Sequence, residues 1–436
     1  MSIDKINSAK AQIASTSAYR TLAEFFDPDS FCELDALVKS GDGFAEVTAG
    51  YGTVEGLPVF AFAQNSDISG GAMSRAQAAK LKKLYKSALK TGAPVVGFYD
   101  SVGGRLAQGT ELLAGCGEAL GMVSRLSGAV PQISVVTGVC LGTNALIATS
   151  ADFVIMTREA RLSLDVTGKN ADADYNAEHG TAAIVAESTE AAVQKARELL
   201  TYLPSNNLTA APETETAEPS PEGSCLVSKT VDGGSKFKIA DAWGKTARVR
   251  LARMDGRVVG IVRTIGKTID CPSAEKTARF VRFCDAFSIP VITFADSDGF
   301  ECLASAKRLV SAYAEATTVK ISAVVGKAVG AAYIALAGTG ANADMVFALP
   351  DATVSPVGIE AAAFIMAPDK MKVPADEQKT VAEDFAAENL SAFNAAQNGF
   401  IDAIVELPQL RGAIVSALDM LAGKRVPTVA KKHGTV

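Results

Sequence analysis

Short apolar runs alternate with mixed segments along the chain, and this alternation predicts the order of its elements. Residues 95–99 and 133–136 are nearly continuous apolar runs, as strands of a sheet covered on both faces require. In each half, a helix precedes such a strand, a second helix leads to the next strand, and that strand runs through a glycine turn into an Ala-rich helix. This spacing predicts parallel β-α units and an α/β fold.

Three blocks of the first half recur in the same order in the second half. Residues 94–103 (PVVGFYDSVG) match 290–299 (PVITFADSDG) at an offset of 196. Residues 133–142 (ISVVTGVCLG) match 321–330 (ISAVVGKAVG) at an offset of 188, and ADFV at 151 matches ADMV at 343 at an offset of 192. Similar offsets in one order predict a duplicated fold.

A polar segment lies almost at mid-chain. Residues 209–224 (TAAPETETAEPSPEGS) are rich in Pro, Glu and Thr, which is the composition of a linker or an exposed loop. We therefore expect an N-terminal domain over residues 1–208, a linker over 209–235 and a C-terminal domain over 236–436.

Composition narrows the classes of partner. Hydrophobic residues make up 48% of the chain and charged residues 21%, which allows large cores. The net charge of −6 argues against a nucleic-acid partner. The first residues lack an apolar signal core, and Gly, Asn or Lys interrupts the most apolar stretches, near 133–148 and 321–338. We expect a cytoplasmic protein without direct membrane insertion.

The seven cysteines are widely scattered. The closest two are 13 positions apart, so the sequence has no CxxC pair, which excludes a zinc ribbon. We expect no metal in this chain. The odd count and the wide spacing predict reduced, mostly structural thiols.

Two turns are candidates for chemistry. At Gly142-Thr143 and at Gly330-Ala331-Ala332, a predicted strand enters a tight turn and a helix begins. The first N–H groups of a helix have no intrahelical acceptor, and the positive end of the helix dipole lies behind them. Such a turn can hold the oxygen of an enolate or of a urea anion. A single turn of this kind is more often a simple strand-to-helix connection, but the duplication supplies two such turns at equivalent places.

Side chains that could serve as a catalytic base are scarce. The only histidines are His179, in a polar stretch, and His433 near the end of the chain. The sequence contains no phosphate-binding G-x-x-x-x-G-K-[ST] loop, and its spacing shows no Ser-His-Asp order. The repeated Asp100-Ser101 and Asp296-Ser297 pairs are expected to cap turns rather than to act as nucleophiles. An enzyme with this inventory stabilises anions with backbone dipoles and takes its proton transfers from its substrates.

Several ordered blocks resemble a known family over nearly the whole chain. They are residues 51–54 (YGTV), 90–94 (KTGAP), 130–134 (VPQIS), 202–207 (YLPSNN), 278–287 (ARFVRFCDAF) and 313–317 (YAEAT). The sequence is similar to the β-type carboxyltransferase subunits of propionyl-CoA and acetyl-CoA carboxylases. It is also similar to the α subunits of methylmalonyl-CoA and glutaconyl-CoA decarboxylases.

The resemblance implies two tandem crotonase-like β-β-α superhelix domains, with acyl-CoA bound by the first and biotin by the second. It implies a homo-hexamer whose active sites lie between the N-half of one subunit and the C-half of another. No biotin domain is visible, so carboxybiotin is expected on a separate biotin carboxyl carrier protein, with a biotin carboxylase or decarboxylase subunit as a further partner. The biotin group would also serve as the base.

The resemblance also implies site residues. Gly142 and Thr143 fall on the positions that hold the acyl carbonyl, and Ala331 and Ala332 on those that hold the biotin carbonyl. The remaining expected binding residues are Ser69, Gly70, Gly71, Gly103, Gly104 and Arg105 on the CoA side, and Gly330, Tyr333 and Ile334 on the biotin side. Ile334 stands where propionyl-preferring relatives have Asp, which implies use of acetyl-CoA or of mixed short acyl groups.

The sequence departs from the family pattern at the site. The usual DSGGAR block reads DSVGGR at 100–105, Thr143 and Ala331 each replace a glycine, and the segments after Phe300 and after Gly168 are shorter. A side chain at a turn restricts positive φ and narrows the pocket. These departures leave a second interpretation open, a non-catalytic structural subunit of such a complex. A crotonase-type hydratase or isomerase ranks third, because no paired glutamates fall at the turns.

Overall fold

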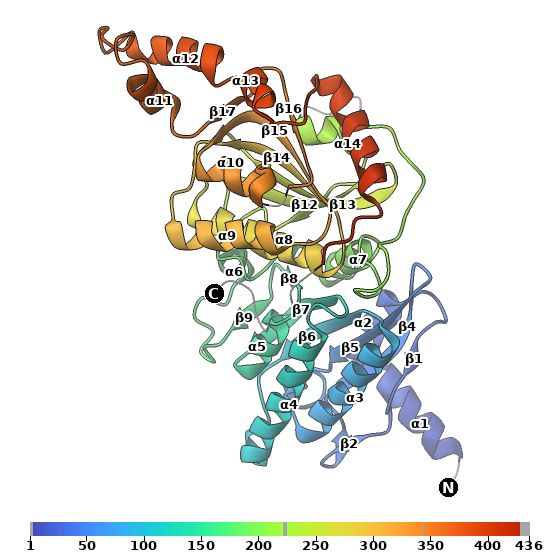
Figure 1. Cartoon of the computed structure of the whole chain (residues 1–436). Coiled ribbons are helices and arrows are strands. Elements are labelled where there is room, and N and C mark those ends of the chain that lie inside the picture. Colours follow the sequence, from blue (N-terminus) through green and yellow to red (C-terminus); the bar gives the residue numbers. More distant parts are fainter. Residues whose placement is uncertain (1–2, 221–224, 342, 428–436) are drawn as a thin grey trace. The chain divides into compact units, whose positions relative to one another are not determined.

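The computed structural model describes residues 3–220, 225–341 and 343–427. The chain forms two compact units, Met1–Pro212 and Glu213–Val436. Each unit is built around one mainly parallel sheet with helices packed against it (Figure 1). Across the described residues, no helix is long and apolar enough to cross a membrane.

The sheet of unit 1 has the strand order β1-β4-β5-β6-β7-β8-β10. After β1 (Cys32–Glu33), the strands β4 (Val47–Val54) and β5 (Leu57–Gln64) form an antiparallel hairpin. The parallel part consists of β6 (Val95–Ser101), β7 (Gln132–Leu141), β8 (Phe153–Thr157) and β10 (Ile184–Ala186). A short strand, β9 (Arg161–Ser163), pairs with the end of β7.

Unit 2 repeats this topology strand for strand, in the order β11-β12-β13-β14-β15-β16-β18. Its hairpin is β12 (Ala247–Met254) and β13 (Arg257–Thr264), preceded by β11 (Phe237–Ile239). The parallel strands are β14 (Val291–Ser297), β15 (Lys320–Val329), β16 (Met345–Ala348) and β18 (Ala403–Ile404), and β17 (Thr353–Ser355) pairs with the end of β15. The predicted duplicated α/β fold is therefore confirmed.

In unit 1, the helices that follow the hairpin and alternate with the parallel strands are α3 (Arg75–Thr91), α4 (Thr110–Leu126), α5 (Thr143–Thr149), α6 (Ala173–Glu178) and α7 (Thr189–Leu200). In unit 2, α8 (Cys271–Ala286), α9 (Leu303–Glu315) and α10 (Ala331–Leu336) correspond to α3, α4 and α5. The remaining helices are α1 (Ile3–Ala14) and α2 (Ser17–Phe25) in unit 1, and α11 (Ile359–Met366), α12 (Gln378–Asn389), α13 (Ala392–Gln397) and α14 (Leu407–Leu421) in unit 2.

Local sequence signals explain where the two equivalent long helices begin. Ser74 caps α3 by accepting the N–H of Gln77, and Asp270 caps α8 by accepting the N–H of Ser273. Gly92, in the left-handed region, ends α3. These helices then pack apolar faces onto strands that are buried almost throughout, such as β6 and β14.

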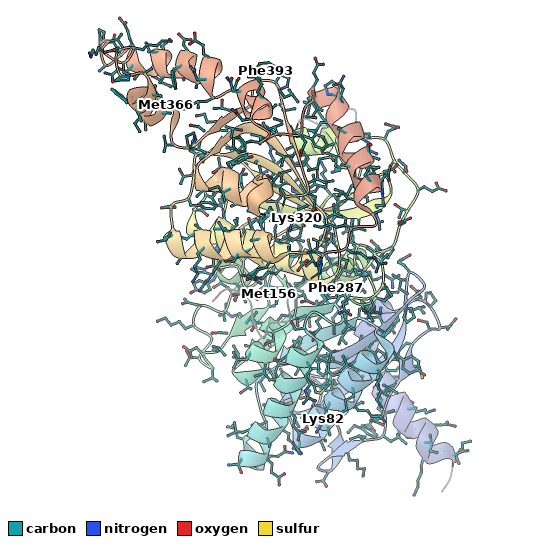
Figure 2. The ribbon with its side chains drawn as sticks, viewed as in Figure 1. Lys82, Met156, Phe287, Lys320, Met366 and Phe393 are labelled. Atoms are coloured by element: carbon teal, nitrogen blue, oxygen red, sulfur yellow. The ribbon has the colours of Figure 1, made fainter. Side chains whose placement is uncertain are left out.

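The core of unit 2 also holds a buried lysine. Lys320, labelled in Figure 2, is 1% exposed, and its ammonium donates hydrogen bonds to the carbonyls of Tyr313 (2.9 Å) and Ala316. Burial lowers the pKa of Lys320 to about 8. The side chain thus satisfies carbonyls at the end of α9, which lack partners within the helix.

From Glu213 onward the polar mid-chain segment belongs to unit 2, and it contacts the hairpin of that unit. The Thr214 N–H donates to the carbonyl of Gly256 (3.0 Å), and the Thr216 hydroxyl donates to Asp255 (2.9 Å). Further along, Asp232 accepts a hydrogen bond from Arg411 of α14 (2.8 Å). Part of the expected linker therefore lies along the hairpin of β12 and β13.

Candidate active site

In unit 1, β7 ends in a turn that presents the first N–H groups of α5. Gly142 has φ 64° and ψ −134°, a conformation that glycine adopts without steric cost. Its own N–H donates to the carbonyl of Ser163 in β9 (3.0 Å). The groups at the start of α5, where no intrahelical acceptor exists, are the N–H groups of Thr143 and Asn144. The N–H of Gly142, a predicted site residue, thus already has an acceptor in the sheet.

The equivalent turn of unit 2 has the same construction. Gly330 has φ 52° and ψ −123°, and its N–H donates to the carbonyl of Ser355 in β17 (2.8 Å). Ala331 and Ala332 then open α10. In both turns the positive φ falls on the glycine, and Thr143 and Ala331 lie in the helix that follows. The side chains at these two positions therefore cause no backbone strain.

A buried amide connects the turn of unit 1 to the neighbouring strand end. Asn144 is 1% exposed, and its Nδ2 donates to Ser101 Oγ (2.7 Å) and to the carbonyl of Gly103 (2.9 Å). Its Oδ1 has no hydrogen-bond partner within the described part of the chain. Asn144 thereby fixes the start of α5 against the loop that follows β6.

The two glycine-bearing loops predicted on the CoA side lie beside one another. The Val102 N–H donates to the carbonyl of Gly70 (3.0 Å), and Met73 exchanges two hydrogen bonds with the loop at Gly103 and Arg105 (2.8 and 2.9 Å). Ser69, Gly70 and Gly71 all have positive φ. The structure thus gathers Ser69–Gly71, Gly103–Arg105 and the turn at Thr143 at one end of the sheet of unit 1.

Arg105 has partners within the protein. Its Nη1 donates to Glu46 Oε1 and to Ser40 Oγ, both at 2.8 Å. Glu46 is fully buried and also accepts a hydrogen bond from Ser74 Oγ (2.6 Å). A buried carboxylate is costly unless it is paired. The main role of Arg105 is therefore to form the ion pair with Glu46.

The repeated Asp-Ser pairs cap turns, as predicted. Asp100 Oδ1 accepts the N–H of Val139 (3.1 Å), and Asp296 Oδ1 accepts the N–H of Lys327 (2.9 Å). Ser101 forms hydrogen bonds with both the N–H and the carbonyl of Gly103, and Ser297 forms the same pair with Gly299. The two aspartates join the ends of adjacent strands, the two serines close the loop that follows their own strand, and all four have backbone partners.

On the biotin side, the two predicted side chains behave differently. The Tyr333 hydroxyl donates to the carbonyl of Phe400 (2.8 Å), and its ring meets the Phe400 ring edge-on with centroids 6.4 Å apart. Ile334 is 54% exposed in the middle of α10. Ile334 is therefore free to meet a ligand, whereas Tyr333 mainly fastens α10 to the segment after α13.

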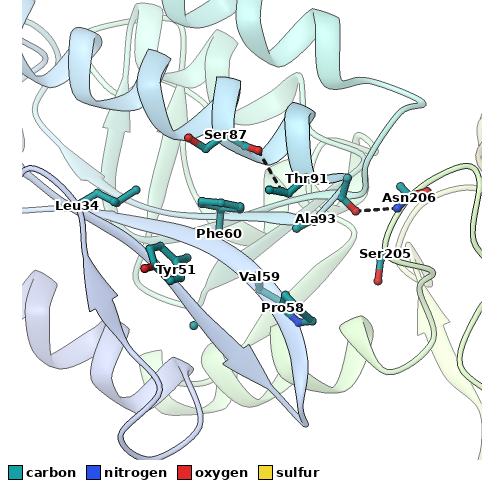
Figure 3. A pocket seen from close by; sticks show the side chains of 12 residues that line it. Leu34, Tyr51, Pro58, Val59, Phe60, Ser87, Thr91, Ala93, Ser205 and Asn206 are labelled. Atoms are coloured by element: carbon teal, nitrogen blue, oxygen red, sulfur yellow. Dashed lines mark hydrogen bonds between the residues drawn. The ribbon is translucent and has the colours of Figure 1, made fainter.

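A pocket of about 580 Å³ in unit 1 contains none of the predicted site residues (Figure 3). It lies where α3 ends and β6 begins, and one wall is held by the hydrogen bond from Asn206 Nδ2 to the carbonyl of Gly92 (2.8 Å). Ser101 ends β6 and Gly103 follows it, at the opposite end of this strand. This pocket is therefore separate from the candidate site.

His179 belongs to neither turn. Its Nδ1 is hydrogen-bonded to the carbonyl of Tyr175 (2.8 Å), and its ring stacks on the Tyr175 ring at 3.9 Å between centroids. Both contacts are made within α6 and its C-terminal cap. His179 is therefore not among the residues that surround the two glycine turns as described above.

The two units form a duplicated crotonase-like fold, and in each a glycine turn presents the first backbone N–H groups of a helix, a geometry that can hold an anionic oxygen. Comparison with known proteins is more specific: residues 16–436 match the carboxyl transferase domain. The chain belongs to this family, and it is an acyl-CoA carboxyltransferase.

Individual relatives resemble the chain over nearly their full length. It is 33% identical to the methylmalonyl-CoA decarboxylase subunit alpha of Veillonella parvula, covering 96% of this chain and 92% of the relative. It is 33% identical to a putative propionyl-CoA carboxylase beta chain of Bacillus subtilis, covering 94% and 91%. A crystal structure of the hexameric transcarboxylase 12S with hydrolysed methylmalonyl-coenzyme A superposes with a TM-score of 0.92 at 29% identity, covering 99% and 98%.

Proposed function

We propose that this chain moves a carboxyl group between biotin on a separate carrier protein and a short-chain acyl-CoA, acetyl-, propionyl- or methylmalonyl-CoA. The observation that carries the proposal is the pair of equivalent turns, in which glycine takes the positive φ and the next two residues open a helix. A reaction with two anionic oxygens, one on each substrate, needs two such turns.

In unit 1, the N–H groups of Thr143 and Asn144 would hold the thioester oxygen of the acyl-CoA. Negative charge grows on this oxygen when the α-carbon loses its proton or carboxyl group. Donors that are already in place stabilise such charge without reorganisation. The Gly142–Ser163 hydrogen bond and the buried amide of Asn144 keep this turn in position.

In unit 2, the N–H groups of Ala331 and Ala332 would hold the carbonyl oxygen of biotin. The residues fit this group, because Gly330 turns the chain and the following N–H groups lack intrahelical acceptors. When bound, the biotin group supplies the carboxyl group and the base. This role agrees with the capping contacts of the nearby Asp and Ser side chains.

On the CoA side, the loops Ser69–Gly71 and Gly103–Arg105 would line the acyl-CoA with backbone groups. Arg105 would act mainly by holding its loop to Glu46, since its Nη1 is already hydrogen-bonded. Unit 1 is accordingly assigned to acyl-CoA and unit 2 to biotin. The assembly we propose is a homo-hexamer that works with a biotin carboxyl carrier protein and a biotin carboxylase or decarboxylase subunit in the cytoplasm.

The test is decarboxylation of malonyl-CoA and methylmalonyl-CoA by the purified chain, with and without biotin or a biotinylated carrier. We expect release of CO2 that depends on biotin. An assembled chain that binds CoA but shows no biotin-dependent turnover with either substrate would overturn the proposal in favour of a structural subunit.

A further inference from the structure

Two cysteines of unit 2 stand at the starts of adjacent helices. Cys271 is the first residue of α8, and Cys302 is the N-cap of α9. The chain segments that lead into these helices are joined by a parallel bridge between Ile269 and Phe300. Its hydrogen bonds run from the Ile269 N–H to Gly299 (2.9 Å) and from the Glu301 N–H to Ile269 (3.0 Å). Each cysteine follows its bridge residue by two positions.

The adjacent helix starts bring the two thiols close to one another. The side chains of Cys271 and Cys302 share a hydrogen bond, and both are partly exposed. One turn further along the helices, Glu275 of α8 accepts a hydrogen bond from Ser305 Oγ (3.3 Å) and pairs with Arg308 of α9. These contacts hold the two helix starts together. Formation of a bond between the two sulfur atoms therefore requires no large movement of the helices.

The thiol pair is not part of the duplicated architecture. At the 196-residue offset that relates the two units here, Arg75 and Leu106 stand in place of the cysteines. There, Arg75 joins α3 to α4 through an ion pair with Glu118 (3.3 Å). The fold therefore does not require cysteine at these positions.

The surroundings give the two thiols different reactivity. Hydrogen bonds with the Cys271 thiol and with the Ser305 hydroxyl, together with the N–H groups of Ser305 and Ala304, lower the pKa of Cys302 to about 7. The shared hydrogen bond with Cys302 raises the pKa of Cys271 to about 11. Ionisation is therefore favoured at Cys302, with the protonated Cys271 thiol beside it, which is the arrangement of an attacking and a resolving cysteine.

We propose that Cys302 and Cys271 form a hydroperoxide-reactive dithiol site that closes to a reversible disulfide. The Cys302 thiolate attacks one peroxide oxygen, the O–O bond breaks, and the other oxygen leaves as an alcohol or water after taking up a proton. Cys271 Sγ then attacks the sulfenic sulfur, the S–S bond forms, and the hydroxyl leaves with the Cys271 proton as water. The two thiols lose two electrons to the peroxide, and an external thiol reverses the step.

The full-length protein can be tested with hydrogen peroxide. Samples are quenched with iodoacetamide, digested and mapped by mass spectrometry. We expect a peptide cross-linked through Cys271 and Cys302 that disappears after treatment with dithiothreitol. Cys225 is the internal control, because it is also partly exposed and its pKa is also lowered, but its sulfur contacts Ser228 Oγ (3.0 Å). Oxidation should place Cys302 in a disulfide but leave Cys225 outside any disulfide, since a neighbouring thiol resolves only the former.

Two variants separate the roles. Cys271→Ser should let Cys302 stop at the sulfenic acid, which dimedone traps, and Cys302→Ser should leave Cys271 unoxidised. The absence of the cross-linked peptide from the oxidised wild-type protein would overturn the proposal even if neither variant folds. A disulfide at Cys225 as abundant as the one at Cys302 would overturn it as well.

Discussion

Ala331 offers the sharpest single-residue test of the proposed chemistry, because a backbone N–H can be removed there without breaking a helical hydrogen bond. Proline is tolerated in the first turn of a helix, and the φ and ψ of Gly330 mirror the extended region that suits a residue before proline. Ala331→Pro should lower biotin-dependent turnover by about 10²–10³-fold, as loss of one oxyanion donor typically does. Steady-state assays of the purified assembly measure this effect.

Ala331→Ser is the matched control, because it keeps the N–H and adds one polar atom at the same exposed position. Its turnover should stay much nearer to that of the wild type. Assembly and CoA binding must be equal in both variants, since the proline ring could also crowd the ligand. Near-normal turnover of an assembled proline variant would mean that this turn is only a connection.

A second residue-scale prediction concerns pH. The contacts of His179 are made within α6 and its cap, by the hydrogen bond to the Tyr175 carbonyl and by ring stacking. His179→Gln should therefore leave turnover within a few-fold at every pH, and the pH–rate profile should be unchanged. A loss of about 10²-fold or more in a folded variant is the size expected for a general base. It would show that His179 is a catalytic base that the proposed mechanism omits.

Ile334 tests the acyl preference. Its apolar side chain is 54% exposed in the middle of α10, and in the proposed shared site it would border acyl groups that differ by one methylene. That difference is worth only about 1–3 kcal/mol. The ratio of kcat/KM between acetyl-CoA and propionyl-CoA should accordingly show a preference rather than exclusion. Strong rejection of acetyl-CoA beside fast turnover of propionyl-CoA would contradict the assignment.

At the scale of elements, the sequence predicts the repeated parts well. The blocks at 94–103 and 290–299 became β6 and β14 with the turns that follow them, and the glycine turns fell where expected. Local signals suffice there, because a buried strand, a glycine and a helix start each leave a recognisable pattern.

Contacts between distant segments left no such pattern. Arg105 pairs with Glu46, 59 residues away, and the N–H groups of Gly142 and Gly330 are taken by the three-residue strands β9 and β17. Asn144 could have been noticed as a polar residue at a helix start, but only the folded chain shows that it is buried against Ser101. These contacts decide which N–H groups remain for a ligand.

The paired strand ends also depend on two glycines. A Cβ at Gly138 would overlap the carboxylate of Asp100, and a Cβ at Gly326 would overlap that of Asp296. Gly138→Ala and Gly326→Ala should each lower the free energy of unfolding by about 1–3 kcal/mol, the usual cost of overpacking. Chemical denaturation measures the change.

Gly121→Ala is the control for these two variants. Gly121 lies on an exposed face of α4 with open space around its Cβ position. Replacing glycine by alanine within a helix should raise stability by about 0.5–1 kcal/mol. If Gly138→Ala were equally stabilising, the carboxylate of Asp100 could move away at no cost, and the strand ends would not be fixed as described.

For the whole molecule, the proposed hexamer predicts that active sites combine unit 1 of one chain with unit 2 of another. Thr143→Pro and Ala331→Pro each remove one donor from a different unit, so each homogeneous assembly should be strongly impaired. Random co-assembly of the two variants, for example by co-expression, restores both donors in about a quarter of sites shared between chains. Activity should therefore recover to about that fraction of wild type, with a light-scattering mass of six chains. Mixed assemblies that stay as inactive as either parent, or a monomeric mass in an active preparation, would rule out a shared site.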